Sequence, residues 1–396
     1  MRRIYLDYAA TTPCLPEVVT AMLPYFSEHF GNASSLHAFG FQARKALEKS
    51  RATVACLLGC ALDDVFFTSS GTESNNMALQ GCLSTAAVRP AHMITTVMEH
   101  TSAYATCRYL ENLGHELTVL SADSEGRIDP AGVEAAIRHN TVLISVQYVN
   151  NEIGTVQPIE AIAAVADSAG ILLHTDAVQA VGKLPIDMRS QKIDMLSASG
   201  HKFYGPKGTG LLCLNRTAAA AKMHARKHLF NGDTLLQPLM HGGKQEAGLR
   251  PATENVAGIV GLAKALELAA ADMAQESARL EALRDNAIDW LLQAIVGVRL
   301  NGPRIGRIAN NINICIPGVN GYELMLLLDR YGIACSTGAA CSTQSEKPSR
   351  VLTAIGLSPL EALESLRLTL GKYIVKDDID YVIGKLVELI STLKQT

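Results

Sequence analysis

The chain has 396 residues, of which 48% are hydrophobic and 18% are charged, and its formal net charge is −3. A chain of this length can bury a sizeable core and has room for two or three domains. The small negative charge argues against a nucleic acid or an anionic membrane surface as the main partner. The N-terminus turns polar too soon for a signal peptide, and no run of about 18 apolar residues could form a membrane span.

The nine cysteines are an odd number without a repeated spacing, which is typical of free thiols in a reducing cytoplasm. The sequence has no Cys-x-x-Cys pair that would indicate a zinc knuckle or a thioredoxin-like site. His224 and His228 have helical i,i+4 spacing, but the basic residues between them favour a solvated helix face over a metal site. We therefore expect a cytoplasmic protein without a metal centre.

In chain order, the first 58 residues predict a short strand, a turn at 9–13 and helices over 17–28 and 41–58. From Asp64 onward, short apolar runs alternate with amphipathic segments such as 158–169. The strand-like runs cover 65–67, 93–97, 117–120, 142–148, 171–174, 195–198 and 210–214. This alternation is typical of βαβ units, so it predicts an α/β fold with a mainly parallel sheet covered on both faces.

The last third of the chain has a different pattern. We expect helices over 261–274, 277–296, 322–331, 349–355, 359–371 and 377–393, with a strand over 310–316. Residues 1–14 and 258–396 would then form a smaller α+β domain that carries a cysteine-containing loop. Residues 15–257 would form the large α/β domain.

Ligands of parallel sheets bind beside the carboxyl ends of the strands, and polar residues follow several predicted strands here. Hydroxyl residues and Gly71 follow the first strand at the start of a helix, where free N–H groups favour a phosphate. Ordinary N-capping explains this segment equally well when it is taken alone. The later strands are followed by His100, by Asn151, by Asp176 with Gln179, and by Lys202.

Lys202 lies on a tight polar turn, Ser199-Gly200-His201-Lys202, directly after a buried strand. Such a lysine is placed to act as a nucleophilic amine that forms a Schiff base with a carbonyl or with pyridoxal phosphate (PLP). A structural loop lysine would explain Lys202 alone. However, PLP needs an anion site, a carboxylate for its ring nitrogen and a lysine for its aldehyde, and all of these occur at the same predicted edge.

These segments resemble the cysteine desulfurases of the NifS/IscS type, which belong to the fold-type I PLP enzymes. The resemblance spans nearly the whole chain in the family's order. The matching stretches are Tyr5–Thr12, Ser70–Ser74, Glu99-His100, Val149–Gly154, His174–Gln179, Ser199–Lys202, Thr253–Val256 and the loop at 335–349.

The resemblance implies a role for each matching site residue. Lys202 would bind PLP covalently, Asp176 would pair with its ring nitrogen, and Gln179 would bond its phenolic oxygen. The phosphate would be held by Gly71, Thr72, Ser199 and His201. Thr253 would reach the phosphate in a partner subunit, which implies a homodimer with shared sites.

The substrate side of the site is also implied by the resemblance. His100 would stack on the cofactor ring and move protons, and Asn151 would lie close to both cofactor and substrate. Arg367 would bind the substrate carboxylate, a task that suits the forked guanidinium group.

The loop at 335–349 separates this family from other PLP enzymes. It is small, polar and poor in apolar residues, which predicts a mobile loop. By the resemblance, Cys341 is the nucleophile that takes sulfur from L-cysteine, releases L-alanine and passes the sulfur to an acceptor protein. Cys335 is a second thiol, and we interpret it as structural filler and not as a disulfide partner of Cys341.

Some features depart from the family pattern or leave alternatives open. Ala33 stands where the family often has proline, and Pro251 could stiffen the segment that presents Thr253. A selenocysteine lyase, a small-amino-acid transaminase and a catalytically silent scaffold are the rival interpretations. The sulfur acceptor is left open among an iron–sulfur scaffold, tRNA thiolation machinery and DNA sulfur modification.

Overall fold

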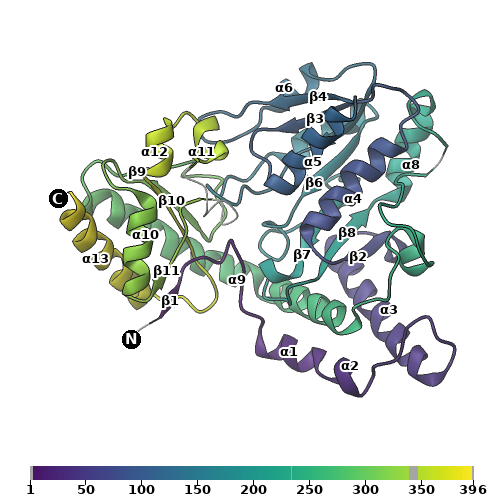
Figure 1. The fold of residues 1–396 in the computed structure, drawn as a ribbon, viewed down its shortest axis with the longest axis horizontal. Coiled ribbons are helices and arrows are strands. Elements are labelled where there is room, and N and C mark those ends of the chain that lie inside the picture. The colour runs from purple at the N-terminus through teal and green to yellow at the C-terminus, as the bar shows by residue number, and fades with distance from the viewer. Residues whose placement is uncertain (1–2, 233, 339–346, 395–396) are drawn as a thin grey trace.

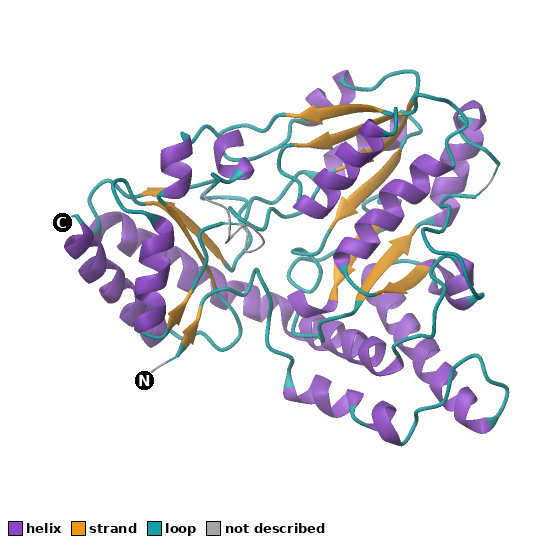
Figure 2. Cartoon of the chain, viewed as in Figure 1, coloured by secondary structure: helices purple, strands orange, loops and turns teal. Residues whose placement is uncertain are grey.

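A seven-stranded sheet forms the centre of the larger part of the molecule (Figures 1 and 2). This computed structural model describes residues 3–232, 234–338 and 347–394. From one edge to the other, the strands are β2 (Val65–Thr68), β8 (Gly210–Leu214), β7 (Met195–Ser199), β6 (Leu172–Asp176), β5 (Thr141–Ser145), β3 (His92–Thr96) and β4 (Glu116–Leu120). Strand β8 runs antiparallel to both of its neighbours, whereas the other pairings are parallel. The predicted mainly parallel sheet is confirmed.

Both faces of this sheet are buried, because successive residues of one strand belong to two different hydrophobic cores. Phe67 and Leu173 pack into one core, while their neighbours Phe66 and Leu172 pack into the other. The first core also takes side chains from α3 (Ala38–Leu58), α7 (Ile159–Ser168) and the start of α9 (Val256–Ala294). The second takes them from α4 (Gly71–Ser84), α5 (Thr101–Asn112) and α8 (Arg216–Ala225). Two covered faces leave the strand ends as the places for polar side chains.

The smaller part of the molecule contains an antiparallel sheet of three strands, β12 (Ser365–Thr369), β10 (Asn311–Cys315) and β9 (Arg299–Leu300). A second pairing joins β1 (Ile4–Tyr5) to β11 (Ile333–Ala334) in parallel. Helices α10 (Gly321–Arg330) and α13 (Lys376–Leu393) pack into the core of this part. The buried side chains of α11 (Arg350–Ala354) and α12 (Pro359–Leu363) belong to the first core of the large sheet. The N-terminal segment continues from β1 into α1 (Pro16–Met22) and α2 (Pro24–Ser27), and α6 (Pro130–Ala135) lies between β4 and β5.

The prediction of a helix over 359–371 is wrong in its second half, where β12 forms. Leu366 and Leu368 point into the core of the small part, and Arg367 lies between them in sequence. This alternation has the two-residue period of a strand, and pairing with β10 satisfies the backbone. Arg367 is therefore carried by a strand.

Helix α9 connects the two parts of the molecule (Figure 1). The sequence predicts two helices, over 261–274 and 277–296, but the structure has one continuous helix of 39 residues. Its first turns pack into a core of the large sheet, and Leu280–Leu291 contribute to the core of the small part. The division at 257/258 stays a prediction, since α9 belongs to both cores.

Among the described residues, no helix combines the length and the hydropathy that a membrane span requires. In the same part of the chain, His, Cys, Asp and Glu side chains do not gather in threes that could hold a metal ion.

A buried ion pair fixes the end of α8 against the sheet. Lys222 Nζ lies 2.7 Å from Asp194 Oδ2, and the two side chains are 7% and 1% exposed. The same carboxylate oxygen accepts the Leu173 N–H at 2.8 Å. Removing the ammonium leaves a buried carboxylate without its counter-charge.

We expect Lys222→Met to lower the free energy of unfolding by about 3 kcal/mol, measured by urea unfolding. The matched control is Lys192→Met, which breaks the exposed ion pair between Lys192 and Asp167 and should change stability by less than about 1 kcal/mol. An equal loss in the two variants would contradict the claim that burial makes the first pair important.

Candidate active site

A cavity of about 230 Å³ opens at the carboxyl ends of the parallel strands. It brings together ten of the predicted site residues, from both parts of the molecule. These are Gly71, Thr72, His100, Asn151, Asp176, Gln179, Ser199, His201, Lys202 and Arg367. Thr253 is exposed and does not line this cavity, and Cys341 lies outside the described residues.

Lys202 ends a short 3-10 turn, Gly200–Lys202, that follows β7. Its Nζ donates to the carbonyl oxygens of Ala9 at 2.6 Å and Ala10 at 2.7 Å. The N-terminal segment is fixed there in turn, because Thr12 N–H donates to the His201 carbonyl at 2.9 Å. The sequence did not predict Ala9 and Ala10 as part of the site. Every residue has a backbone carbonyl, so the identity of a residue does not show that its carbonyl belongs to a site. Only the folded structure shows that these two do.

Asp176 lies at the end of β6 and is 2% exposed. Its Oδ2 accepts from Asn75 Nδ2 at 2.7 Å, and its Oδ1 accepts the Val178 N–H at 3.0 Å. Both donors are neutral, and a buried carboxylate is stabilised further by a positive partner. A protonated pyridine nitrogen supplies such a partner, so this carboxylate fits the ring of PLP.

Asn75 also connects Asp176 to His100, and the sequence analysis did not single it out. Its Nδ2 lies 2.9 Å from Ser102 Oγ, which lies 2.7 Å from His100 Nδ1. The Ser102 N–H donates to the same ring nitrogen at 3.1 Å. His100 Nδ1 is therefore an acceptor, and in the neutral ring the proton lies on Nε2. Asn75 lies one helical turn after Gly71 in α4, and this spacing could have indicated from the sequence that it belongs to the site.

Burial and the neighbouring Lys202 act on both histidines of the site. Burial lowers the pKa of His100, Asp176 opposes this effect and Lys202 adds to it. Burial, with Lys202 as the next contribution, lowers the pKa of His201 to about 4. His201 is therefore neutral at pH 7, and its Nδ1 lies 3.1 Å from Thr11 Oγ1.

The phosphate-binding prediction concerns the N-terminus of α4 and the turn after β7. Helix α4 begins at Gly71, and a side-chain carbon built there would lie 2.5 Å from Val178 Cγ2. Ser199 faces the same cavity. A helix N-terminus with a closely packed glycine, next to Ser199 and His201, is suited to a phosphate group. These residues fit PLP as a set.

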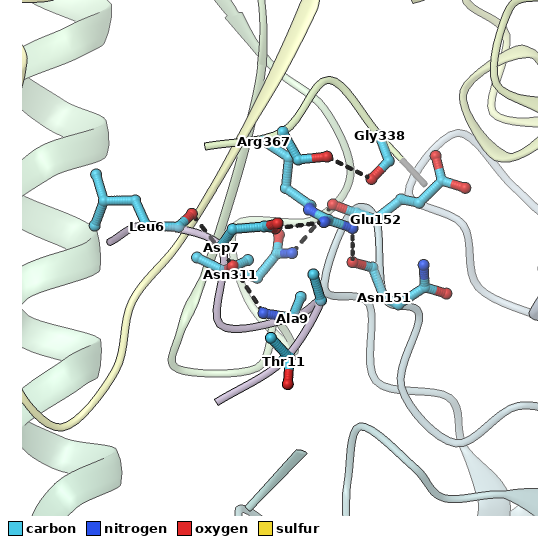
Figure 3. A network of polar contacts seen from close by, with 12 residues as sticks. Leu6, Asp7, Ala9, Thr11, Asn151, Glu152, Asn311, Gly338 and Arg367 are labelled. Carbon is cyan, nitrogen blue, oxygen red and sulfur yellow. Dashed lines mark hydrogen bonds and ion pairs between the residues drawn. The ribbon is translucent and has the colours of Figure 1, made fainter. Parts of the chain in front are cut away.

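Arg367 enters the cavity from β12 with its guanidinium group 1% exposed (Figure 3). Nη2 lies 2.8 Å from Asp7 Oδ1, and Nη1 donates to the Asn151 carbonyl at 3.0 Å. The buried Nε has no hydrogen-bond partner among the described residues. A buried donor without a partner is unfavourable, so the group has capacity for an incoming acceptor such as a carboxylate.

The described residues on either side of 339–346 contact residues of the site or their neighbours in the chain. Ser336 exchanges two backbone hydrogen bonds with Arg367, at 3.1 and 2.6 Å. At the other end, Ser349 Oγ donates to Glu152 Oε2 at 2.5 Å, and Arg350 donates to the Glu99 carbonyl at 2.6 Å. Glu152 also approaches Gly338, since a side-chain carbon built there would lie 3.2 Å from Glu152 Oε2.

Cys335 precedes this segment and packs against the core of the small part. Burial, followed by the charge of Asp7, raises the pKa of its thiol to about 12. A thiol in such surroundings is inert. This agrees with the interpretation of Cys335 as filler.

Comparisons with known proteins agree with this arrangement. The family described as Aminotransferase class-V matches residues 4–382. The cysteine desulfurase IscS of Dictyoglomus turgidum is 45% identical over 394 residues, which cover 99% of this chain and 96% of that protein. The IscS of Methanosarcina thermophila is 43% identical, with 99% and 93% covered.

Solved structures show the same likeness. A NifS-like protein superposes with a TM-score of 0.89 at 32% identity, covering 99% of this chain and 100% of that one. The structure of SspA in complex with cysteine gives a TM-score of 0.78 at 37% identity, covering 94% and 100%.

The fold and the site thus define a fold-type I PLP enzyme of the class-V aminotransferase family. The full-length relatives narrow this further, and the chain belongs to the cysteine desulfurases of that family.

Glu99 precedes His100 and is 1% exposed. Its Oε1 accepts from Thr96 Oγ1 and from the Gln147 N–H, while Oε2 has no partner among the described residues. Burial raises its pKa from 4.5 to about 8. The folded protein therefore holds this proton where the unfolded chain has lost it, so the stability from Glu99 falls as pH rises from 4.5 through 8.

We expect the melting temperature of Glu99→Gln, relative to the unsubstituted protein, to increase between about pH 6 and about pH 9, because the amide never ionises. Thermal unfolding at several pH values measures this difference. Glu116→Gln removes a partly exposed carboxyl whose pKa is lowered, so it should show no such trend. A difference for Glu99→Gln that is constant with pH would contradict a buried, protonated carboxyl.

Proposed function

We propose that this chain removes sulfur from L-cysteine, releasing L-alanine and leaving a persulfide on Cys341. In this reaction the Cβ–S bond of the substrate breaks, and its electron pair stays on Cβ and takes up a proton. An S–S bond forms between the substrate sulfur and the Cys341 thiolate. The products together contain every atom of L-cysteine and of the Cys341 thiol, so no external oxidant or reductant is needed. The convergence of Lys202, Asp176, His100 and Arg367 on one cavity supports this proposal most directly.

Each side chain has a proposed task. PLP, when bound, supplies an electron sink that stabilises negative charge on the substrate carbons. Lys202 binds the cofactor, and Asp176 keeps its ring nitrogen protonated. Gly71, Thr72, Ser199 and His201 hold the phosphate, and Gln179 bonds the phenolic oxygen. His100, a neutral ring with its proton on Nε2, stacks on the ring and exchanges protons with the substrate.

Arg367 and Asn151 are proposed to orient the substrate. Arg367 is held on two sides by Asp7 and by the Asn151 carbonyl (Figure 3). Its Nε lacks a partner within the described part of the chain. A substrate carboxylate there would gain a charge-assisted hydrogen bond from the buried guanidinium group. The complex of SspA with cysteine supports L-cysteine as the substrate class.

The ends of the cysteine loop support Cys341 as the acceptor of the sulfur. Gly338 and Ser349 both approach Glu152, next to Asn151 at the cavity. Cys341 follows Gly338 by three residues, and three residues of extended chain span at most about 11 Å. We therefore propose the Cys341 thiol as the group that takes the sulfur from the substrate.

A homodimer with a shared site is also part of the proposal. Thr253 is exposed in one chain and does not line the cavity, which suits a residue that serves a partner subunit. The IscS names of the relatives favour iron–sulfur cluster assembly as the use of the sulfur. The acceptor itself would be a protein that collects the persulfide sulfur.

The test is to add L-cysteine to the purified, PLP-loaded protein and to measure alanine and enzyme-bound persulfide together. We expect equal amounts of both in a single turnover, and Cys341→Ser should abolish persulfide while keeping the visible absorption of the cofactor. A transaminase would retain its activity in Cys341→Ser, and a silent scaffold would show no cofactor absorption. Alanine without persulfide or sulfide would overturn the proposal. A parallel assay with selenocysteine distinguishes a selenocysteine lyase.

We expect Arg367→Gln to lower kcat/KM for L-cysteine about 100-fold, which corresponds to about 2.7 kcal/mol for a lost charge-assisted interaction. Steady-state alanine release measures it. Cysteamine lacks the carboxylate, so the same substitution should change its slow turnover far less. A similar loss for both compounds would indicate a distorted site and would contradict carboxylate binding by Arg367.

A further inference from the structure

Lys183 contacts Gln179 four residues earlier in the turn that follows β6. Its Nζ lies 3.0 Å from Gln179 Oε1 and 3.3 Å from the Gln179 carbonyl oxygen. On the other side of the same amide, Gln179 Nε2 donates to the Ala9 carbonyl at 2.8 Å. That carbonyl also accepts from Lys202 Nζ at 2.6 Å. A continuous set of hydrogen bonds therefore runs from Lys183 through Gln179 to the acceptor of the reactive lysine.

These contacts determine which way the Gln179 amide faces. In its charged form Lys183 has only donors, so the amide oxygen is the atom that faces it. A carbonyl has only acceptors, so the atom facing Ala9 must be the amide nitrogen. One N–H of that nitrogen bonds Ala9, and the second remains for the cavity that Gln179 lines. Lys183 and the Ala9 carbonyl therefore impose the same orientation on the amide, and the contact with Lys183 adds to the preference that Ala9 alone would give.

The turn itself fixes Lys183 in place. Gly182 has φ of +76°, and a side-chain carbon there would lie 2.8 Å from Phe203 Cβ, one residue after Lys202. The Lys183 N–H donates to the Ala180 carbonyl at 3.0 Å. The turn that carries Lys183 therefore packs directly against the turn that carries the reactive amine.

The surroundings of Lys183 are largely apolar. It lines a second cavity of about 60 Å³, together with Leu268, Ala269 and the ion pair of Lys372 with Asp272. Burial, and then the charge of Lys202, lower the pKa of Lys183 to about 7. Holding a lysine in such a place lowers the stability of the folded protein, even with both oxygens of Gln179 as acceptors. This cost indicates that the contact with Gln179 has a function.

We propose that Lys183 is a positioning residue that orients the Gln179 amide, so that an N–H group and not the carbonyl faces the phenolic oxygen of bound PLP. This inference rests on the proposed function, because it takes Lys202 as the cofactor-binding lysine. It adds that Lys183 acts on the cofactor through Gln179. The alternative is that Lys183 only closes the turn through its bond to the Gln179 backbone carbonyl.

The visible absorption of PLP bound to lysine changes with pH, and its midpoint reports the hydrogen bonds to the phenolic oxygen. An N–H donor withdraws charge from that oxygen and lowers the midpoint, whereas a carbonyl facing it raises the midpoint. We expect Lys183→Met to raise the midpoint by about one pH unit. Lys183→Arg keeps the charge and the donors, and the neighbouring cavity has room for it, so it should restore the midpoint.

Two controls separate this role from a general loss of charge or of structure. Lys372 lines the same cavity but does not contact Gln179. Lys372→Met should therefore leave the midpoint unchanged. In a Gln179→Leu background, Lys183→Met should add no further shift, because the amide through which it acts is absent. Lys183→Gln, shorter and neutral, serves as the second variant if Lys183→Met does not fold.

The outcomes are distinct. An unchanged midpoint in Lys183→Met overturns the inference, and so does a shift of equal size in the Gln179→Leu background, which indicates a direct charge effect. If the unsubstituted protein forms no visible band with PLP, and Lys202→Ala behaves identically, the proposed function itself has failed.

Discussion

The site depends on the hydrogen bonds that the N-terminal segment offers to Lys202. An ammonium group inside a protein needs acceptors, and the carbonyls of Ala9 and Ala10 supply them. The same Ala9 carbonyl accepts from Gln179, and Thr12 bonds the turn on which Lys202 lies. A segment from the start of the chain thus orders two elements of the large sheet, although it shares no strand with that sheet.

The second requirement is a fixed relation between the two parts of the molecule. Arg367 comes from a small-part strand, yet its guanidinium contacts the Asn151 carbonyl of the large part. Asn311 and Asn313 on β10 donate to the Glu152 carbonyl, at 3.1 and 3.0 Å. Gly154 has φ of +74° and lies against Asn311 with no space for a side chain. The loop that carries Asn151 is therefore held from the small part, and the proposed substrate groups keep their spacing.

Much of this site could be predicted from the sequence, because strand ends that share an edge collect polar side chains in a recognisable order. Asp176, His100 and Lys202 each follow an apolar run, and they do meet in one cavity. The helix predicted through Arg367 was wrong because leucines at 366, 368 and 370 suit a strand, and helix-like spacing around them hid this period. Asn75 and Ser102 were missed because their importance lies in contacts with His100 and Asp176, which spacing along the chain does not reveal.

Gly338 and Ser349 meet at a single side chain, Glu152. Because these two described residues lie against the same side chain, the ends of a chain segment that joins them are close together. Each doubling of such a segment adds only about 0.6 kcal/mol of closure entropy. Residues could therefore be added to or removed from the chain between Gly338 and Ser349 at a small cost in stability, without disturbing the cavity residues.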